Sequence, residues 1–217
     1  MIVQAISLKK QLHQVQLISI VCIGVGLLSS VGIYLLSRIT GLPPSSLTRD
    51  AVSVLGAGPH IGLLSTLGVM LWAASTAVCL CGGIVLSRDV AQQQARRFLV
   101  VSGMLSLGLT LDDGLLLHEA LAPRFLHIPE SIVLAVYLVV LNGYLAYFLR
   151  QVLRTDYVLF ILALTFLGVS ALIDQILPFS DPVTFVEDIL KFTGILFWLA
   201  YYSRVVVVLI QGTIKEY

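Results

Sequence analysis

The stretch Leu109–Glu119, LTLDDGLLLHE, places two adjacent carboxylates, a histidine and a third carboxylate inside or at the end of an apolar span. An ionisable side chain at membrane depth costs about 2.5–3.5 kcal/mol on insertion scales, so such side chains usually face a bundle interior or a watery cavity. Asp112 and Asp113 therefore need a cation, a proton or strong hydrogen-bond donors close by. The stretch indicates where the polar site of this protein lies.

The composition around this stretch is that of an integral membrane protein. Of 217 residues, 58% are hydrophobic and only 12% are charged, whereas an ordinary soluble domain has about 25% charged residues. Several apolar runs reach the roughly 18 residues that a membrane-crossing helix needs. The sequence therefore predicts an all-α, polytopic membrane helix bundle that forms one transmembrane domain over residues 1–217.

Six transmembrane helices are predicted from the apolar runs. The first connection, residues 40–60, is long and polar; Pro43 and Pro44 end a helix there, and Ser45–Leu55 is expected to form a short interfacial helix. The other connections are short, so adjacent helices are expected to be antiparallel neighbours. The predicted spans are residues 16–37, 62–87, 97–118, 130–150, 157–177 and 184–210.

The orientation is predicted from the Lys and Arg residues of the short loops, which are enriched on the cytoplasmic side. This predicts a cytoplasmic N-terminus and a cytoplasmic C-terminus, in a bacterial cytoplasmic (inner) membrane. The cytoplasmic side would hold Lys9, Lys10, Arg88, Arg96, Arg97, Arg150, Arg154 and Lys215. The outer side would hold Arg38, Arg49 and Arg124.

A faint internal repeat runs through the second half of the chain. The segment 145–150, LAYFLR, matches 199–204, LAYYSR, and 107–110, LGLT, which precedes Asp112, resembles 167–170, LGVS, which precedes Asp174. These matches favour two related helical hairpins in parallel orientation. Short matches in a restricted alphabet also arise by chance, so both interpretations stay open.

Several classes of partner and cofactor are excluded by the sequence. The net charge is +1 and no basic tract occurs, so we expect no nucleic acid. Haem ligation within the membrane would need histidines facing each other in mid-span, so we expect no haem, and we expect no nucleotide. The expected partners are membrane lipids and a small-molecule or lipid substrate, and the sequence leaves an oligomer open.

The predicted orientation brings most carboxylates and three of the four histidines to the outer face. Asp112 and Glu119 are seven residues apart, so we expect them to share one helix face. Carboxylate and imidazole groups together are suitable ligands for a divalent metal ion. The predicted metal ligands are His118, Glu119, Asp112 and Asp174. The predicted catalytic residues are Asp112, Asp113, Glu187 and Lys191.

Simpler interpretations of the same residues remain open. His118 and Glu119 could merely end a helix in the headgroup region. Glu187 and Lys191 form a favourable i, i+4 pair, or Lys191 reaches across as the counter-ion of Asp112, Asp113 or Asp174. Asn142, in the middle of the fourth span, is interpreted as a helix–helix hydrogen bond rather than a ligand.

Three functions are compatible with this sequence. The first is a metal-dependent membrane hydrolase or transferase at the outer interface, in which one carboxylate activates a bound water. The second is a non-catalytic membrane subunit or sensor, in which the charges form a structural salt-bridge network. The third is a proton- or cation-coupled transporter. The apolar character of the cytoplasmic halves of the spans counts against transport.

Overall fold

The structure is a computed structural model that describes residues 8–48, 54–58, 60–86, 90–178 and 180–215. The chain divides into two compact units, Met1–Ile61 and Gly62–Tyr217. Helices account for the regular structure of the described ranges, and no strand occurs in them. The predicted all-α class is therefore confirmed.

The first unit contains a long helix and a short one. Helix α1 (Leu8–Thr40) ends where Gly41 takes a left-handed conformation, with φ 71°. Gly41 N–H donates to the Ser37 carbonyl at 3.0 Å, and Ser37 Oγ donates to the Leu42 carbonyl at 2.7 Å. Helix α2 (Pro44–Thr48) follows directly. The predicted break at the two prolines is confirmed, and the rest of the predicted interfacial helix includes residues 49–53, which lie outside the described residues.

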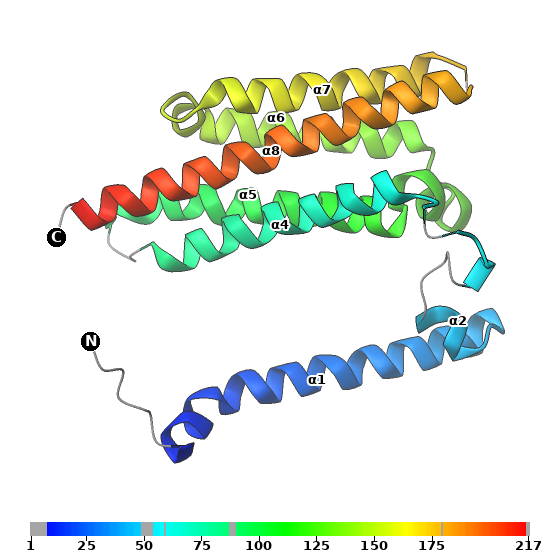
Figure 1. Cartoon of the computed structure of the whole chain (residues 1–217), viewed down its shortest axis with the longest axis horizontal. Helices are drawn as coiled ribbons and strands as arrows, with labels where there is room; N and C mark the ends of the chain where they lie inside the picture. The colour runs from blue at the N-terminus through cyan, green and yellow to red at the C-terminus, as the bar shows by residue number, and fades with distance from the viewer. Residues whose placement is uncertain (1–7, 49–53, 59, 87–89, 179, 216–217) are drawn as a thin grey trace. The chain divides into compact units, whose positions relative to one another are not determined.

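The second unit is a bundle of long helices that run back and forth (Figure 1). Its elements are α4 (Leu63–Val85), α5 (Val90–Leu115), the π-helix η1 (Leu117–Leu126), α6 (Glu130–Leu153), α7 (Tyr157–Ile176) and α8 (Asp181–Lys215). Five of these helices, α4 to α8, are long and apolar enough to cross a membrane. The structure thus shows a helical bundle with five candidate membrane spans, which is compatible with the predicted membrane protein.

The finer details of the predicted topology stay predictions. Helix α1 covers the predicted first span, but many of its side chains lie outside the described residues, so the count of six spans is not tested. The orientation rests partly on Lys9, Lys10, Arg88 and Lys215, whose side chains also lie outside them. The two-hairpin repeat is likewise neither confirmed nor contradicted.

Aromatic side chains fill the centre of the bundle. Trp72 on α4 meets Trp198 on α8 edge to face, with ring centroids 5.5 Å apart. Tyr201 and Tyr202 are fully buried next to it. The buried aromatic residues are Trp72, Phe98, Tyr144, Phe148, Phe160, Trp198, Tyr201 and Tyr202. Trp198 and its neighbours thus pack helices together.

A stripe of hydroxyl groups follows one face of α5. Ser102, Ser106 and Thr110 are spaced four residues apart, so they lie one above the other on the helix. Trp198 Nε1 donates to Ser106 Oγ at 3.0 Å, and the Thr110 hydroxyl lies 3.4 Å from the Thr76 hydroxyl on α4. Polar contacts of this kind hold neighbouring helices together inside a membrane.

A buried hydroxyl triad joins three helices at the other end of this stripe. Ser102 Oγ lies 2.8 Å from the Tyr144 hydroxyl on α6, which lies 2.8 Å from the Tyr202 hydroxyl on α8. All three residues are buried. Because water cannot replace a lost partner there, the triad should contribute to stability.

Tyr144→Phe is expected to lower the free energy of unfolding by about 1 kcal/mol, because it leaves two buried hydroxyls short of a partner. Tyr147→Phe is the matched control, since Tyr147 lies on the same helix with 67% of its surface exposed. Thermal unfolding in detergent would measure both. Equal melting temperatures for the two variants would contradict the structural role of the triad.

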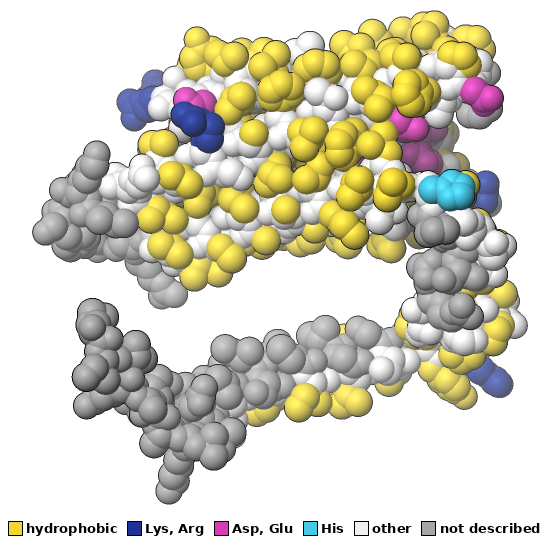
Figure 2. All heavy atoms as spheres, viewed as in Figure 1, with side chains coloured by type: hydrophobic (Ala, Val, Ile, Leu, Met, Phe, Trp, Pro, Cys, Tyr) yellow, Lys and Arg dark blue, Asp and Glu magenta, His cyan; other side chains and the backbone are white. Residues whose placement is uncertain are grey.

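Charged side chains divide between the two ends of the bundle. Figure 2 shows acidic side chains gathered near the end at which α7 ends and α8 begins, which we call the acidic end. Its carboxylates are Asp112, Asp113, Glu119, Glu130, Asp174, Asp181, Glu187 and Asp188. The opposite end, called the arginine end, carries Arg96, Arg97, Arg150, Arg154 and Arg204 together with Asp156. The predicted gathering of carboxylates at one end of the spans is therefore observed.

Candidate functional site

The candidate site lies where α5 ends, and α5 ends earlier than predicted. The helix stops at Leu115, Leu116 takes a left-handed conformation with φ 52°, and η1 follows. The expectation that Asp112 and Glu119 share one helix face is therefore wrong. The cause lies in Asp112: its Oδ1 accepts the backbone N–H of His118 at 3.1 Å, a donor that a continuous α-helix would have bonded to the Gly114 carbonyl.

The left-handed turn at Leu116 also brings the His118 ring into contact with the Asp112 carboxylate. His118 Nδ1 lies 2.6 Å from Asp112 Oδ2, and Asp112 is only 4% exposed. On the other side of the ring, Nε2 lies 3.5 Å from Glu119 Oε1. Tyr137 of α6 packs edge-on against the imidazole, with ring centroids 6.4 Å apart. Asp112 thus fastens η1 to the end of α5 through two contacts.

The adjacent carboxylate points to different helices. Asp113 Oδ1 lies 2.8 Å from Lys191 Nζ on α8, and Asp113 Oδ2 accepts a hydrogen bond from Trp72 Nε1 on α4 at 2.9 Å. The side chains of Asp113 and Lys191 are 11% and 31% exposed. Of the three acids proposed as partners of Lys191, the structure selects Asp113. The pair links α4, α5 and α8 at the acidic end.

The remaining acids lie around these two pairs. Asp174 on α7 is exposed and accepts a hydrogen bond from Gln175 Nε2 at 3.0 Å. Glu130 at the start of α6 and Glu187 in the first turns of α8 are both electrostatic neighbours of Asp174. The acids therefore gather, but at the edge of the bundle rather than around one buried point.

The predicted metal site gains no support from this geometry. Among the residues that the structure describes, no group of three or more His, Cys, Asp or Glu side chains is placed to hold a metal ion. Asp112, His118, Glu119 and Asp174 hence do not form such a group. A divalent metal ion stays a prediction, as do the catalytic roles proposed for Asp112, Asp113, Glu187 and Lys191.

One protein family matches most of the chain. A family model described as "Domain of unknown function (DUF8692)" matches residues 17–205. The chain belongs to this family. The DUF8692 match begins inside α1 and ends inside α8, so it contains both ion pairs of the acidic end. No curated protein and no solved structure matches the chain.

Two aromatic residues of the site in this DUF8692 chain were missed by the sequence analysis. Trp72 donates to Asp113, and Tyr137 lies beside both Asp112 and His118. Each looks like an ordinary apolar position of a span when read alone. The signal that could have found Trp72 is the need of a buried carboxylate for donors that carry no charge.

His118 lies beyond Leu115, where the candidate span on α5 ends, and its surroundings alter the protonation of its imidazole. The hydrogen bond to Asp112 raises the pKa of His118 above its ordinary value of 6.5, and the negative charges of Asp112 and Glu119 act in the same direction. Burial and the positive charge of Lys191 oppose the shift. The pair is therefore strongest with His118 protonated.

We expect the stability of the bundle to fall as the pH rises above 6.5. A group whose folded pKa is raised contributes fully below its unfolded pKa, and the contribution is lost as the pH rises through the folded pKa. Melting temperatures between pH 6 and pH 9 would show the decline. In His118→Gln this part of the pH dependence should disappear, and an unchanged profile in that variant would contradict the assignment.

Proposed function

We propose that this protein is a non-catalytic integral membrane subunit or sensor, in which two partly buried ion pairs fix the arrangement of helices at the acidic end. One observation carries this proposal: both adjacent carboxylates, of which Asp112 is buried and Asp113 is partly buried, already have partners within the chain. Asp112 is paired with His118, and Asp113 is paired with Lys191.

The two ion pairs connect α5 to different elements. Asp112 and Asp113 are neighbours in sequence and therefore point to different sides of α5. One holds η1 and the other holds α8. Buried ion pairs often add little net stability, but in some proteins they select one packing arrangement over others. A membrane subunit that must present one fixed surface would use them in this way.

The proposed topology is unchanged from the sequence prediction. Six spans would place the arginine end and both termini in the cytoplasm of a bacterial cell, with the acidic end outside. The arginines at one end of the bundle support this orientation. Cysteine-accessibility labelling in intact cells at Phe125, exposed in η1, and at Tyr157, exposed at the start of α7, would test it. Labelling of position 157 but not 125 by an impermeant reagent would contradict it.

The double substitution Asp112→Asn with His118→Asn tests the proposed function. An Asn amide nitrogen takes the place of His118 Nδ1, the atom that contacts Asp112, so the pair can still hydrogen-bond but loses its charge and the basic imidazole. In a strain with a measurable deletion phenotype, the variant should restore the wild type if it accumulates to the wild-type level. Failure at that level would show that the pair carries chemistry.

A second candidate function is a membrane hydrolase or transferase at the outer interface. The observation that favours it is the His118–Asp112 dyad, because a carboxylate behind an imidazole is the arrangement that orients a general base. The predicted metal-dependent form needs a divalent ion in addition. Elemental analysis of detergent-purified protein tests this form, and a stoichiometric metal removed by Glu119→Gln would favour the enzyme over the structural proposal.

A further inference from the structure

One polar side chain at mid-span faces away from the bundle. Asn142 is the thirteenth of the 24 residues of α6, so it lies about 16–18 Å from either end of the helix. The hydrocarbon core of a bilayer is about 30 Å thick, which places this amide near its middle. Among the described residues of the second unit, Asn142 does not make the predicted helix–helix hydrogen bond, because its side chain is exposed there.

The amide has hydrogen-bonding capacity to spare. Among the described residues, Asn142 Nδ2 donates to the Leu138 carbonyl one turn earlier at 2.7 Å, and this is the single hydrogen bond that the amide makes. A carboxamide has a second N–H and an acceptor oxygen. The lipid hydrocarbon has no groups that could satisfy them. An exposed amide at this depth therefore calls for a polar partner.

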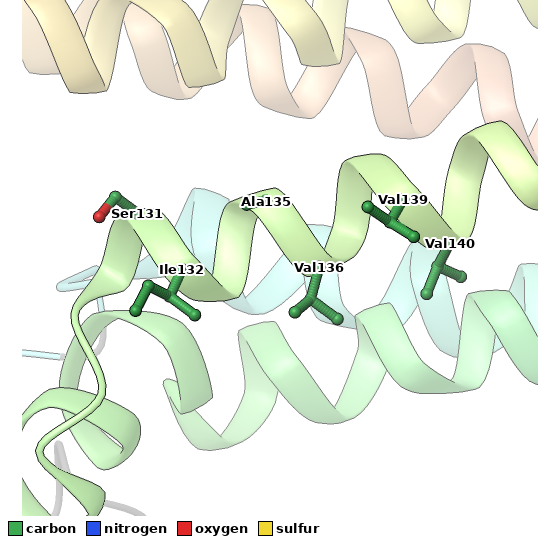
Figure 3. A pocket seen from close by; sticks show the side chains of 6 residues that line it. All are labelled: Ser131, Ile132, Ala135, Val136, Val139 and Val140. Carbon is green, nitrogen blue, oxygen red and sulfur yellow. The ribbon is translucent and has the colours of Figure 1, made fainter.

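The face of α6 that carries Asn142 has small exposed residues, which would allow a second helix to pack closely. Ser131, Ala135, Val139 and Ala146 are exposed too. Together with Asn142 they follow one another at intervals of three or four residues, so the five form one seam along α6. Small residues in such a seam let two helix backbones approach closely. A shallow groove of about 340 Å³ opens over the outer half of the seam (Figure 3). Of the five candidate spans, α6 is also the least buried, with 11% of its apolar window inside against 39% for α4 and α8.

We propose that the occupant of this seam is α6 of a second copy of this chain, with Asn142 hydrogen-bonded to Asn142 of the partner subunit. Two copies inserted with the same topology are related by a two-fold axis along the membrane normal. The two α6 helices then run parallel, and equal residues lie at equal depth. Since a carboxamide both donates and accepts, Asn142 is its own complement in this arrangement.

The equilibrium test uses the full chain in phosphatidylcholine–phosphatidylglycerol vesicles. Energy transfer between differently labelled copies, measured over a range of protein-to-lipid ratios, gives the dissociation constant of the dimer. Asn142→Leu is expected to raise it about tenfold, because interhelical hydrogen bonds are lost. Tyr147→Phe, on the same exposed helix, should leave it unchanged. A chain that is monomeric at every ratio, or an unchanged constant in Asn142→Leu, overturns the proposal.

A cross-linking test reports on the seam itself. In a background with the three native cysteines replaced by alanine, Ala146→Cys should give a disulfide-linked dimer on mild oxidation. Ile161→Cys on α7 is the control, since Ile161 is also exposed but lies outside the seam. Equal cross-linking at the two positions overturns the proposal. The proposal is also overturned if Ala146→Cys forms disulfides with other membrane proteins but no disulfide-linked dimer of this chain.

Discussion

Lys191→Met is expected to destabilise the bundle by about 3 kcal/mol, because it leaves the carboxylate of Asp113, whose side chain is only 11% exposed, without its positive partner. The hydrogen bond from Trp72 remains but cannot neutralise the charge. Denaturation by a mixed-micelle titration would measure the loss. The substitution conserves length and apolar contacts, so the effect reports on the charge.

Arg204→Met on the same helix is the matched control for that experiment. Arg204 also forms an ion pair, 2.6 Å from Asp156, but its side chain is 62% exposed. Exposed pairs of this kind contribute little to stability. A loss in Arg204→Met as large as the loss in Lys191→Met would show that burial does not set the value of these pairs.

Gly194→Ala is expected to cost about 2 kcal/mol through overpacking between α7 and α8. A Cβ at this position would lie 2.7 Å from Leu167 Cγ and 3.0 Å from the Leu167 backbone nitrogen. The side chain can turn away, but the backbone of α7 cannot without separating the two helices. The intrinsic helix preference of Ala over Gly, at most about 1 kcal/mol, offsets only part of this cost.

Gly168→Ala separates packing from helix propensity in that comparison. Gly168 lies one residue after Leu167 on α7, and a Cβ there would meet nothing within 4 Å. This variant should be neutral or slightly more stable. Melting temperatures in detergent compare the two directly. A Gly194→Ala protein as stable as Gly168→Ala would contradict the close approach of α7 and α8.

The spans were predictable because length and apolar composition alone decide whether a helix can cross a bilayer. The predicted span 62–87 is α4 (Leu63–Val85), and 157–177 is α7 (Tyr157–Ile176). The end of α5 was not predictable in the same way. Leu115, Leu116 and Leu117 give no breaking signal, and the break depends on a side chain, Asp112, that takes a backbone donor from the helix.

The pairing of the charges was only partly predictable. The need of Asp113 for a counter-ion follows from its place in an apolar candidate span, and Lys191 was the available cation. Which of three acids it meets depends on how α5 and α8 are rotated about their axes, and packing sets this rotation. The steric fit of Gly194 against Leu167 is part of that packing.

The buried hydroxyls correct the expectation that the halves of the spans towards the arginine end are almost wholly apolar. Ser102, Tyr144 and Tyr202 form a polar contact there, and Tyr201 bonds Thr155 nearby. Serine and tyrosine are common enough in spans that single positions carry no signal. The four-residue spacing of Ser102, Ser106 and Thr110 was the available pattern.

A double-mutant cycle on Asp113 and Lys191 tests the central claim most directly. The four proteins are the wild type, Asp113→Leu, Lys191→Met and the double variant, and the free energy of unfolding is measured for each. If the pair is the structural link between α5 and α8, each single variant loses stability and the double variant recovers most of it, which gives a coupling energy of about 2 kcal/mol. Losses that simply add would mean that the two charges act independently, and the account of the acidic end would be wrong.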